Sequence, residues 1–156
     1  MTDKQYQAKK WLSRNYELNR EIKLLEDKLE VSRQRVNNIV GRYELNEIQM
    51  QHNRGGREDL IAEVIELEDL IERRLKFLMS EDNLTTEVIN RLETSIERAV
   101  LIARYVNRYS WTKIERIYRY SHAQMMRIHL SALDKIIIEE DDTHEERFAG
   151  FEQLSV

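Results

Sequence analysis

Cysteine and proline are absent from this chain of 156 residues, and glycine occurs only four times. Without cysteine, disulfides, thiolate catalysis and cysteine zinc sites are excluded. Strands are normally separated by turns rich in glycine, proline and asparagine, and the sequence offers such a cluster only at Asn53–Gly56. An all-β or doubly wound fold is therefore not expected, and the composition predicts an all-α protein.

Long apolar runs are missing as well. No stretch approaches the roughly 18 uncharged residues that span a bilayer, and Met1–Lys10 lacks the apolar core of a signal peptide. We therefore expect no contact with a membrane and a soluble, intracellular protein. The formal net charge of −4 would by itself argue weakly against a nucleic-acid partner, but the distribution of the charges argues the other way.

The first half of the chain carries a narrow apolar stripe with a period of 3.5 residues, which is typical of a coiled-coil seam. Its positions are Trp11, Asn15, Leu18, Ile22, Leu25, Leu29, Ser32, Val36, Ile39 and Tyr43. A predicted loop at Gln51–Arg57 follows, and the stripe then resumes at Leu60, Val64, Leu67, Ile71 and Leu78. We predict a coiled-coil helical hairpin over residues 1–80, with the seam closed within one chain or shared between subunits.

The pattern changes after a polar junction at Ser80–Thr86, where Thr85 or Thr86 could cap a new helix. A broader apolar face predicts a helix over 87–106, and two shorter periodic segments follow at 111–118 and 122–138. Ser110 and Ser121 are suited to cap these two helices. We therefore predict a three-helix domain with a helix-turn-helix over residues 81–138, followed by a flexible acidic tail at 139–156.

Charge is unevenly distributed over this second half. Residues 104–135 hold seven basic and two acidic side chains, whereas 139–147 hold six acidic and one basic. A basic helical module favours contact with phosphate, since lysine and arginine supply most of the sequence-independent affinity for nucleic acid. The alternative is a chance excess in a chain of which 35% is charged.

The predicted last helix orients its residues in a way that suits DNA recognition. If Met125, Ile128, Ala132 and Leu133 face inward, the outward residues of the first turns are His122, Ala123, Gln124, Met126 and Arg127. A recognition helix presents these turns to the major groove, where glutamine can pair with adenine, arginine with guanine or phosphate, and alanine with a thymine methyl. Trp111 is expected to anchor the short helix, or alternatively to contact the DNA backbone together with Thr112 and Lys113.

These residues resemble a known family. The segment Ala103–Ile114, with its Arg104-Tyr105 pair and Ser110-Trp111 step, precedes Tyr120-Ser121 and then Arg127-Ile128-His129 and Ala132-Leu133. This order is similar to the C-terminal helix-turn-helix of phage transcriptional regulators of the ArpU and RinA type, a module similar to region 4 of sigma-70 factors. Arg119 stands where that family usually has glycine, which predicts a remodelled turn.

The resemblance implies a sequence-specific DNA-binding regulator, and more specifically an activator, of phage or prophage late or packaging genes. It would act in the cytoplasm of a bacterial host cell on double-stranded promoter DNA, with host RNA polymerase as a possible partner and with homo-oligomers formed through the coiled coil. The DNA-binding candidates are Trp111, Thr112, Lys113, Arg116, Arg119, Ser121, His122, Gln124, Arg127 and His129.

A second interpretation is a non-catalytic helical adaptor or packaging-associated protein that uses the helix-turn-helix end to bind protein. No enzyme is expected, because the sequence has no phosphate loop, nucleophile elbow or His-Glu-x-x-His motif. We expect no cofactor and no metal site, since charge runs such as Glu139–Asp142 are usually solvated surfaces.

Overall fold

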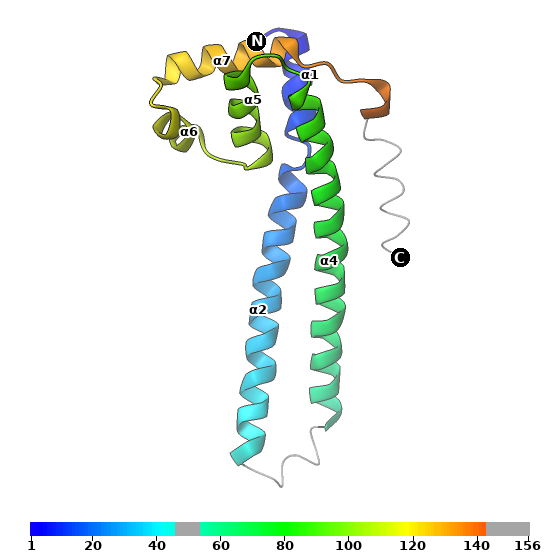
Figure 1. Cartoon of the computed structure of the whole chain (residues 1–156). Coiled ribbons are helices and arrows are strands. Elements are labelled where there is room, and N and C mark those ends of the chain that lie inside the picture. Colours follow the sequence, from blue (N-terminus) through cyan, green and yellow to red (C-terminus); the bar gives the residue numbers. More distant parts are fainter. Residues whose placement is uncertain (46–53, 143–156) are drawn as a thin grey trace. The chain divides into compact units, whose positions relative to one another are not determined.

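A computed structural model describes the backbone of residues 1–45 and 54–142 and the side chains of 1–41 and 56–142 (Figure 1). In this part of the chain every regular element is a helix, which confirms the predicted all-α class. The elements are α1 (Asp3–Leu12), α2 (Tyr16–Leu45), α4 (Arg54–Asn90), α5 (Ser95–Leu101), the π-helix η1 (Ile102–Val106), α6 (Trp111–Tyr118), α7 (His122–Lys135) and the 3-10 turn η2 (Glu140–Asp142). None of the described helices has the length and apolar character required to cross a membrane.

The chain divides into two compact units. The first combines Met1–Tyr16 with the chain from Met79 onward, and the second is Glu17–Leu78. The predicted division at residue 80 therefore lies close to one boundary, but α1 belongs with the helix-turn-helix and not with the hairpin. The reason is that α1 packs on α7, where the Gln5 amide donates hydrogen bonds to the Leu130 carbonyl and to Asp134.

In the second unit, α2 and the first part of α4 run side by side in opposite directions (Figure 1). Leu29 packs against Leu67 and Ile71 at the seam. Ion pairs tie the two helices together, between Arg33 and Glu68 at 2.8 Å and between Arg74 and Glu21. The predicted hairpin is thus closed within one chain.

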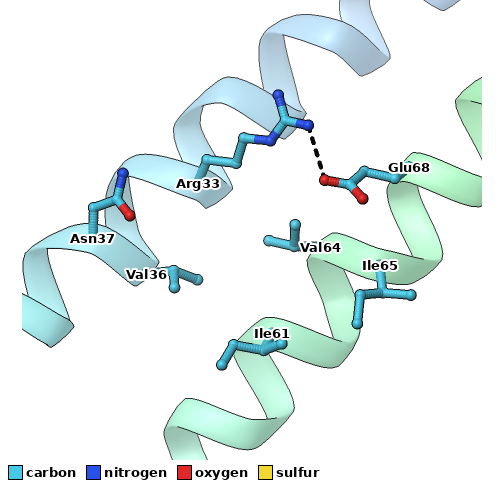
Figure 2. A pocket seen from close by; sticks show the side chains of 7 residues that line it. All are labelled: Arg33, Val36, Asn37, Ile61, Val64, Ile65 and Glu68. Carbon is cyan, nitrogen blue, oxygen red and sulfur yellow. Dashed lines mark hydrogen bonds and ion pairs between the residues drawn. The ribbon is translucent and has the colours of Figure 1, made fainter.

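Further along this hairpin the seam opens into a shallow groove, which Figure 2 shows beside the Arg33–Glu68 ion pair. Its apolar lining comes from both helices, with Val36 on α2 and Ile61, Val64 and Ile65 on α4. Ile65 remains 52% exposed, which shows that two helices alone cannot enclose this part of the seam.

The predicted stripe that begins at Trp11 does not lie on one continuous helix. The α1 helix ends at Leu12, and a turn at 13–15 separates it from α2. Ser13 donates its hydroxyl to the Lys9 carbonyl at 2.7 Å, while Arg14 donates to Glu81. These polar contacts end the helix, and the apolar period could not reveal them.

The predicted junction at Ser80–Thr86 is also wrong, because α4 continues through it to Asn90. The hydroxyls of Thr85 and Thr86 donate to the carbonyls of Glu81 and Asp82, one turn earlier, at 3.0 and 2.8 Å. Threonine often bonds within a helix in this way instead of capping a new one. The chain leaves the helix only after Asn90, and α5 begins at Ser95.

The predicted loop at Gln51–Arg57 lies only partly within the described residues, and it is wrong for residues 54–57, which are helical. Residues 46–53 lie outside the described residues, but α4 begins at Arg54 and so includes Gly55 and Gly56. This start is compatible with the sequence, because the first turn of a helix has amide groups without helical partners and is the place where glycine costs least.

The helix-turn-helix unit has a layered core. One layer joins α1, the end of α4, α5 and α7 through Leu12, Ile89, Leu101 and Leu133. On the α5 side, Glu97 is buried and accepts hydrogen bonds from Ser131 and Lys135 on α7. The three-helix domain of the prediction is therefore completed by α1 and by the end of α4.

The predicted flexible acidic tail at 139–156 is wrong for its first residues, because Asp142 is held in the fold. Asp142 is only 5% exposed; it forms an ion pair with Arg91 at 2.8 Å, and its carbonyl accepts a hydrogen bond from the indole of Trp11 at 2.9 Å. The chain up to Asp142 is thus part of the first unit, whereas 143–156 lie outside the described residues.

Candidate nucleic-acid interface

The two helices of the predicted helix-turn-helix are present with the expected caps. The Ser110 hydroxyl accepts a hydrogen bond from the Lys113 amide at the start of α6, and Ser121 caps α7 in the same way. Arg119 ends α6 with φ 55° and ψ 38°, the left-handed conformation for which glycine is the usual residue. Arg119 thus adopts the backbone conformation that glycine usually provides, and the predicted remodelling of the turn is not seen at this residue.

A small core fixes α6 against α7. Ile114 and Met125 are completely buried and pack with Val100 and Ala103. Met125, Ala132 and Leu133 face inward as predicted, and Ile128 is half-buried. This packing leaves the opposite surface of the helix pair in contact with solvent.

Most of the predicted DNA-binding residues are exposed on α6, on α7 or in the turn between them. Trp111 is half-buried and His129 is buried, whereas the others are exposed: Thr112, Lys113, Arg116, Arg119, Ser121, His122, Gln124 and Arg127. The first four belong to α6 and its end, and the last four to the cap and first turns of α7. The fold therefore brings two separate stretches of sequence onto one helix pair.

Three guanidinium groups of this surface have no counter-ion. Arg116, Arg119 and Arg127 form no ion pair with any described residue. The nearby Lys113 ammonium lies 3.6 Å from the centroid of the Tyr109 ring, in a cation–π contact that leaves its charge uncompensated. Positive charge that is not neutralised within the fold is available to an anionic partner.

Glu115 is the acidic residue of α6, and it is paired. His122 at the start of α7 lies with its Nδ1 2.5 Å from a Glu115 carboxylate oxygen. This contact joins the two helices. The pair could not be predicted from the sequence, because the two residues meet only when the turn is formed.

His129 does not lie on the exposed surface, so the prediction that it faces DNA is wrong. Its ring is 4% exposed, with Nε2 2.7 Å from the Tyr105 hydroxyl and the ring edge against Trp111. Burial lowers the pKa of His129 to about 4, and the positive charges of Lys9 and Arg104 act in the same direction. The neutral imidazole is therefore a part of the core.

Trp111 matches the first of its two predicted interpretations, that of an anchor. Its half-buried ring rests against His129, and the guanidinium of Arg104 lies 5.0 Å from the ring centroid. Arg104 also donates to the Tyr109 carbonyl at 2.9 Å. The π-helix η1 carries Arg104 and so places this cation next to the start of α6.

Gln124 has a structural contact that was not predicted. Its side-chain oxygen accepts hydrogen bonds from the Ser121 amide at 3.0 Å and from the Ser121 hydroxyl at 3.1 Å. Together with the bond from the Gln124 amide to the Ser121 hydroxyl, this is a capping box. The spacing Ser-x-x-Gln is the sequence signature of that motif and could have predicted it.

Comparison of the chain with protein-family models, with curated proteins and with solved structures found no match.

Proposed function

We propose that this protein is a transcriptional regulator that binds double-stranded DNA through α6 and α7. The observation that carries the proposal is that three exposed arginines of the helix-turn-helix, Arg116, Arg119 and Arg127, form no ion pair with any described residue. A buried core fixes α6 against α7, so the backbone positions that carry the cations are set before a partner binds. Cations presented by such a helix pair are suited to the phosphates that flank a DNA groove.

In this proposal the two helices have different tasks. The first turns of α7 enter the major groove, which is wide enough to admit one helix. Arg116 and Arg119 contact the phosphates at the edge of the groove, and Lys113 does so from the first turn of α6. The amides of Trp111 and Thr112 add to this contact, since a helix N-terminus favours phosphate.

The biological setting is part of the same proposal. Activation of phage or prophage late or packaging genes, together with host RNA polymerase, is inferred from the resemblance of residues 103–133. A pair of subunits would have to use a surface other than the middle of the coiled-coil seam, since Leu29 already packs on Leu67 and Ile71 of its own chain.

The salt dependence of binding to duplex DNA tests the proposal. The wild-type chain should bind a mixed pool of short duplexes with an affinity that falls steeply as salt rises, because each neutralised phosphate releases counter-ions. The double variant Arg116→Ala/Arg119→Gly should reduce the slope of log affinity against log salt by about 2. Glycine is chosen at 119 because it keeps the left-handed backbone.

A matched control removes the same charge from the other unit. Arg35 and Arg73 are exposed on the hairpin, and the variant Arg35→Ala/Arg73→Ala should leave the slope unchanged. Equal loss in both double variants would mean that only the net charge matters. A wild-type chain with no salt-dependent affinity for any duplex would contradict the proposal altogether.

A protein adaptor remains the second candidate, and one observation favours it. Ile117 and Tyr120 are large apolar side chains that stay 54% and 38% exposed at the end of α6. Such side chains suit a protein partner better than phosphate. Under this alternative, selection from a random pool of duplexes would enrich no sequence, and Arg127→Ala would change no DNA affinity.

A further inference from the structure

The exposed side chains at the start of α7 differ in whether their polar groups are available to form hydrogen bonds with a base. Within the first two turns of this fully described helix, the long polar side chains on the exposed face are His122, Gln124 and Arg127. Which of them can pair with a base edge depends on the hydrogen bonds that each already makes within the fold.

The side chain of Gln124 already forms hydrogen bonds at the N-terminal end of its own helix. Paired recognition of adenine requires the amide oxygen to accept from the adenine amino group while the amide nitrogen donates to N7. The Gln124 oxygen already accepts from the Ser121 amide and hydroxyl. Reading adenine would break the capping box, and the loss of a helix cap weakens a fold. Gln124 is therefore not expected to pair with adenine, in contrast to the contact predicted from the sequence.

The side chain of His122 already contacts the neighbouring helix, α6. Its Nδ1 lies against the Glu115 carboxylate, and the contact bridges α6 and α7. A His122 ring that turned toward a base would lose this contact and leave the Glu115 carboxylate, which is 22% exposed, without its partner on α7. The bridge thus serves the geometry of the helix pair.

The side chain of Arg127 neither caps its own helix nor contacts a described residue of the neighbouring helix through a hydrogen bond or an ion pair. It is exposed, and no described residue forms a hydrogen bond or an ion pair with its guanidinium. It lies one helical turn after Ala123, on the same face, and the small Ala123 side chain permits α7 to approach the base pairs closely. The guanidinium fork matches the two acceptors of guanine, O6 and N7.

We propose that Arg127 determines sequence specificity by donating two hydrogen bonds to one guanine in the major groove, while Gln124 acts only as the cap of α7. This inference rests on the proposed DNA-binding function. It differs from a phosphate contact because the loss of Arg127 should change which sequences are bound, and not only how tightly all of them are bound.

Selection of bound duplexes from a random pool tests the proposal, with the full chain as wild type, Arg127→Ala, Gln124→Ala and Arg119→Gly. The wild-type motif should contain one position that is almost always guanine. Arg127→Ala should lose the preference at that position alone, by about 5- to 100-fold in relative affinity. Arg119→Gly should weaken all sequences alike and leave the motif unchanged, and Gln124→Ala should likewise leave the base preferences unchanged.

A second experiment tests one hydrogen-bond acceptor, N7 of the preferred guanine, in the selected duplex. Replacing the preferred guanine with 7-deazaguanine removes the N7 acceptor, and this should weaken binding of the wild type at least several-fold while affecting Arg127→Ala less than twofold. Circular dichroism of each variant checks that α7 is still folded, and Arg127→Gln provides a second variant with a good helix former.

The results of these experiments distinguish the guanine contact of Arg127 from DNA binding in general. If Arg127→Ala binds every duplex more weakly but selects the same motif, Arg127 contacts phosphate and the guanine contact is wrong, while DNA binding stands. If Gln124→Ala alone loses an adenine preference, the capping role assigned to Gln124 is wrong. If the wild type binds no duplex, the proposed function fails and this inference fails with it.

Discussion

The two units of this protein bury their side chains to different degrees. In the helix-turn-helix unit, Ile114, Met125 and Leu133 are 0% exposed, whereas the core cluster of the hairpin, Leu29, Leu67 and Ile71, remains 6–9% exposed. A pair of helices meets along a single seam with water on both sides, but a unit of several helices surrounds a side chain completely. The same chemical change should therefore cost more free energy in the first unit than in the second.

The largest difference is expected for ion pairs. Arg14 and Glu81 in the first unit have side chains 8% and 1% exposed, whereas Arg33 and Glu68 in the hairpin are 50% and 43% exposed. Arg14→Ala should lower the free energy of unfolding by about 3–5 kcal/mol, because it removes a guanidinium from a buried carboxylate. Arg33→Ala should lower it by no more than about 1 kcal/mol.

Urea unfolding followed by circular dichroism measures both changes. Arg14→Lys is the informative control, because a lysine keeps the charge but cannot reproduce the contacts of the fork with both Glu81 and Thr85. Equal losses for Arg14→Ala and Arg33→Ala would show that the two ion pairs are equivalent, against the difference in their burial.

Substitutions that shorten a buried apolar side chain should also cost more free energy of unfolding in the helix-turn-helix unit than in the hairpin. The difference between the two units should be smaller than for the ion pairs. Met125→Ala removes a completely buried side chain between α6 and α7 and should cost about 2–5 kcal/mol. Leu29→Ala in the hairpin should fall at the lower end of that range, about 2 kcal/mol, because water can fill the space from the sides of the seam. Thermal unfolding by calorimetry would resolve the difference, and a larger loss for Leu29→Ala would reverse the comparison.

Acidification should weaken the helix-turn-helix unit through His129. Its pKa is lowered to about 4 in the fold, whereas an unfolded histidine titrates near 6.5. Between these values the unfolded chain binds the additional proton, so the contribution is fully present above about pH 6.5 and is lost as the pH falls toward 4. The loss should reach up to about 3 kcal/mol at the acidic end, since each pKa unit corresponds to 1.36 kcal/mol.

Urea unfolding between pH 7.5 and 4 follows this dependence. His129→Gln should flatten the curve in that window, because glutamine can keep a hydrogen bond to Tyr105 without titrating. A flat curve for the wild-type chain would contradict the assigned burial of a neutral His129.

The smallest effect is expected on the outer surface of the hairpin. Leu24 and Val31 are 68% and 48% exposed and lie two turns apart on α2. Leu24→Lys/Val31→Lys should change the free energy of unfolding by less than about 0.5 kcal/mol for each substitution, because neither side chain is buried. Sedimentation of both proteins should give the same mass, and a lower mass for the variant would reveal self-association through this face.

Much of the local structure was predictable from the sequence. The caps Ser110 and Ser121 and the inward residues Met125, Ala132 and Leu133 were all predicted correctly, since caps and helical periodicity depend on neighbours within a few positions. The helix ends at Leu12 and Asn90 were not predicted, because contacts between residues distant in sequence, or bonds within the helix itself, decide them. His129 illustrates the same limit: an Arg-x-His spacing places a ring on a helix but does not say that Tyr105 and Trp111 enclose it.

The order of polar and apolar residues alone determined that this protein is helical and that its first half pairs along a narrow stripe, because those properties follow from the periodicity of one chain segment. Only the tertiary structure decided that α1 completes the helix-turn-helix unit and that His122 meets Glu115, while Arg127 has no ion-pair partner among the described residues. A hydrogen bond or an ion pair requires two groups to meet in space, and the partner of a side chain across a turn is fixed only when the chain has folded.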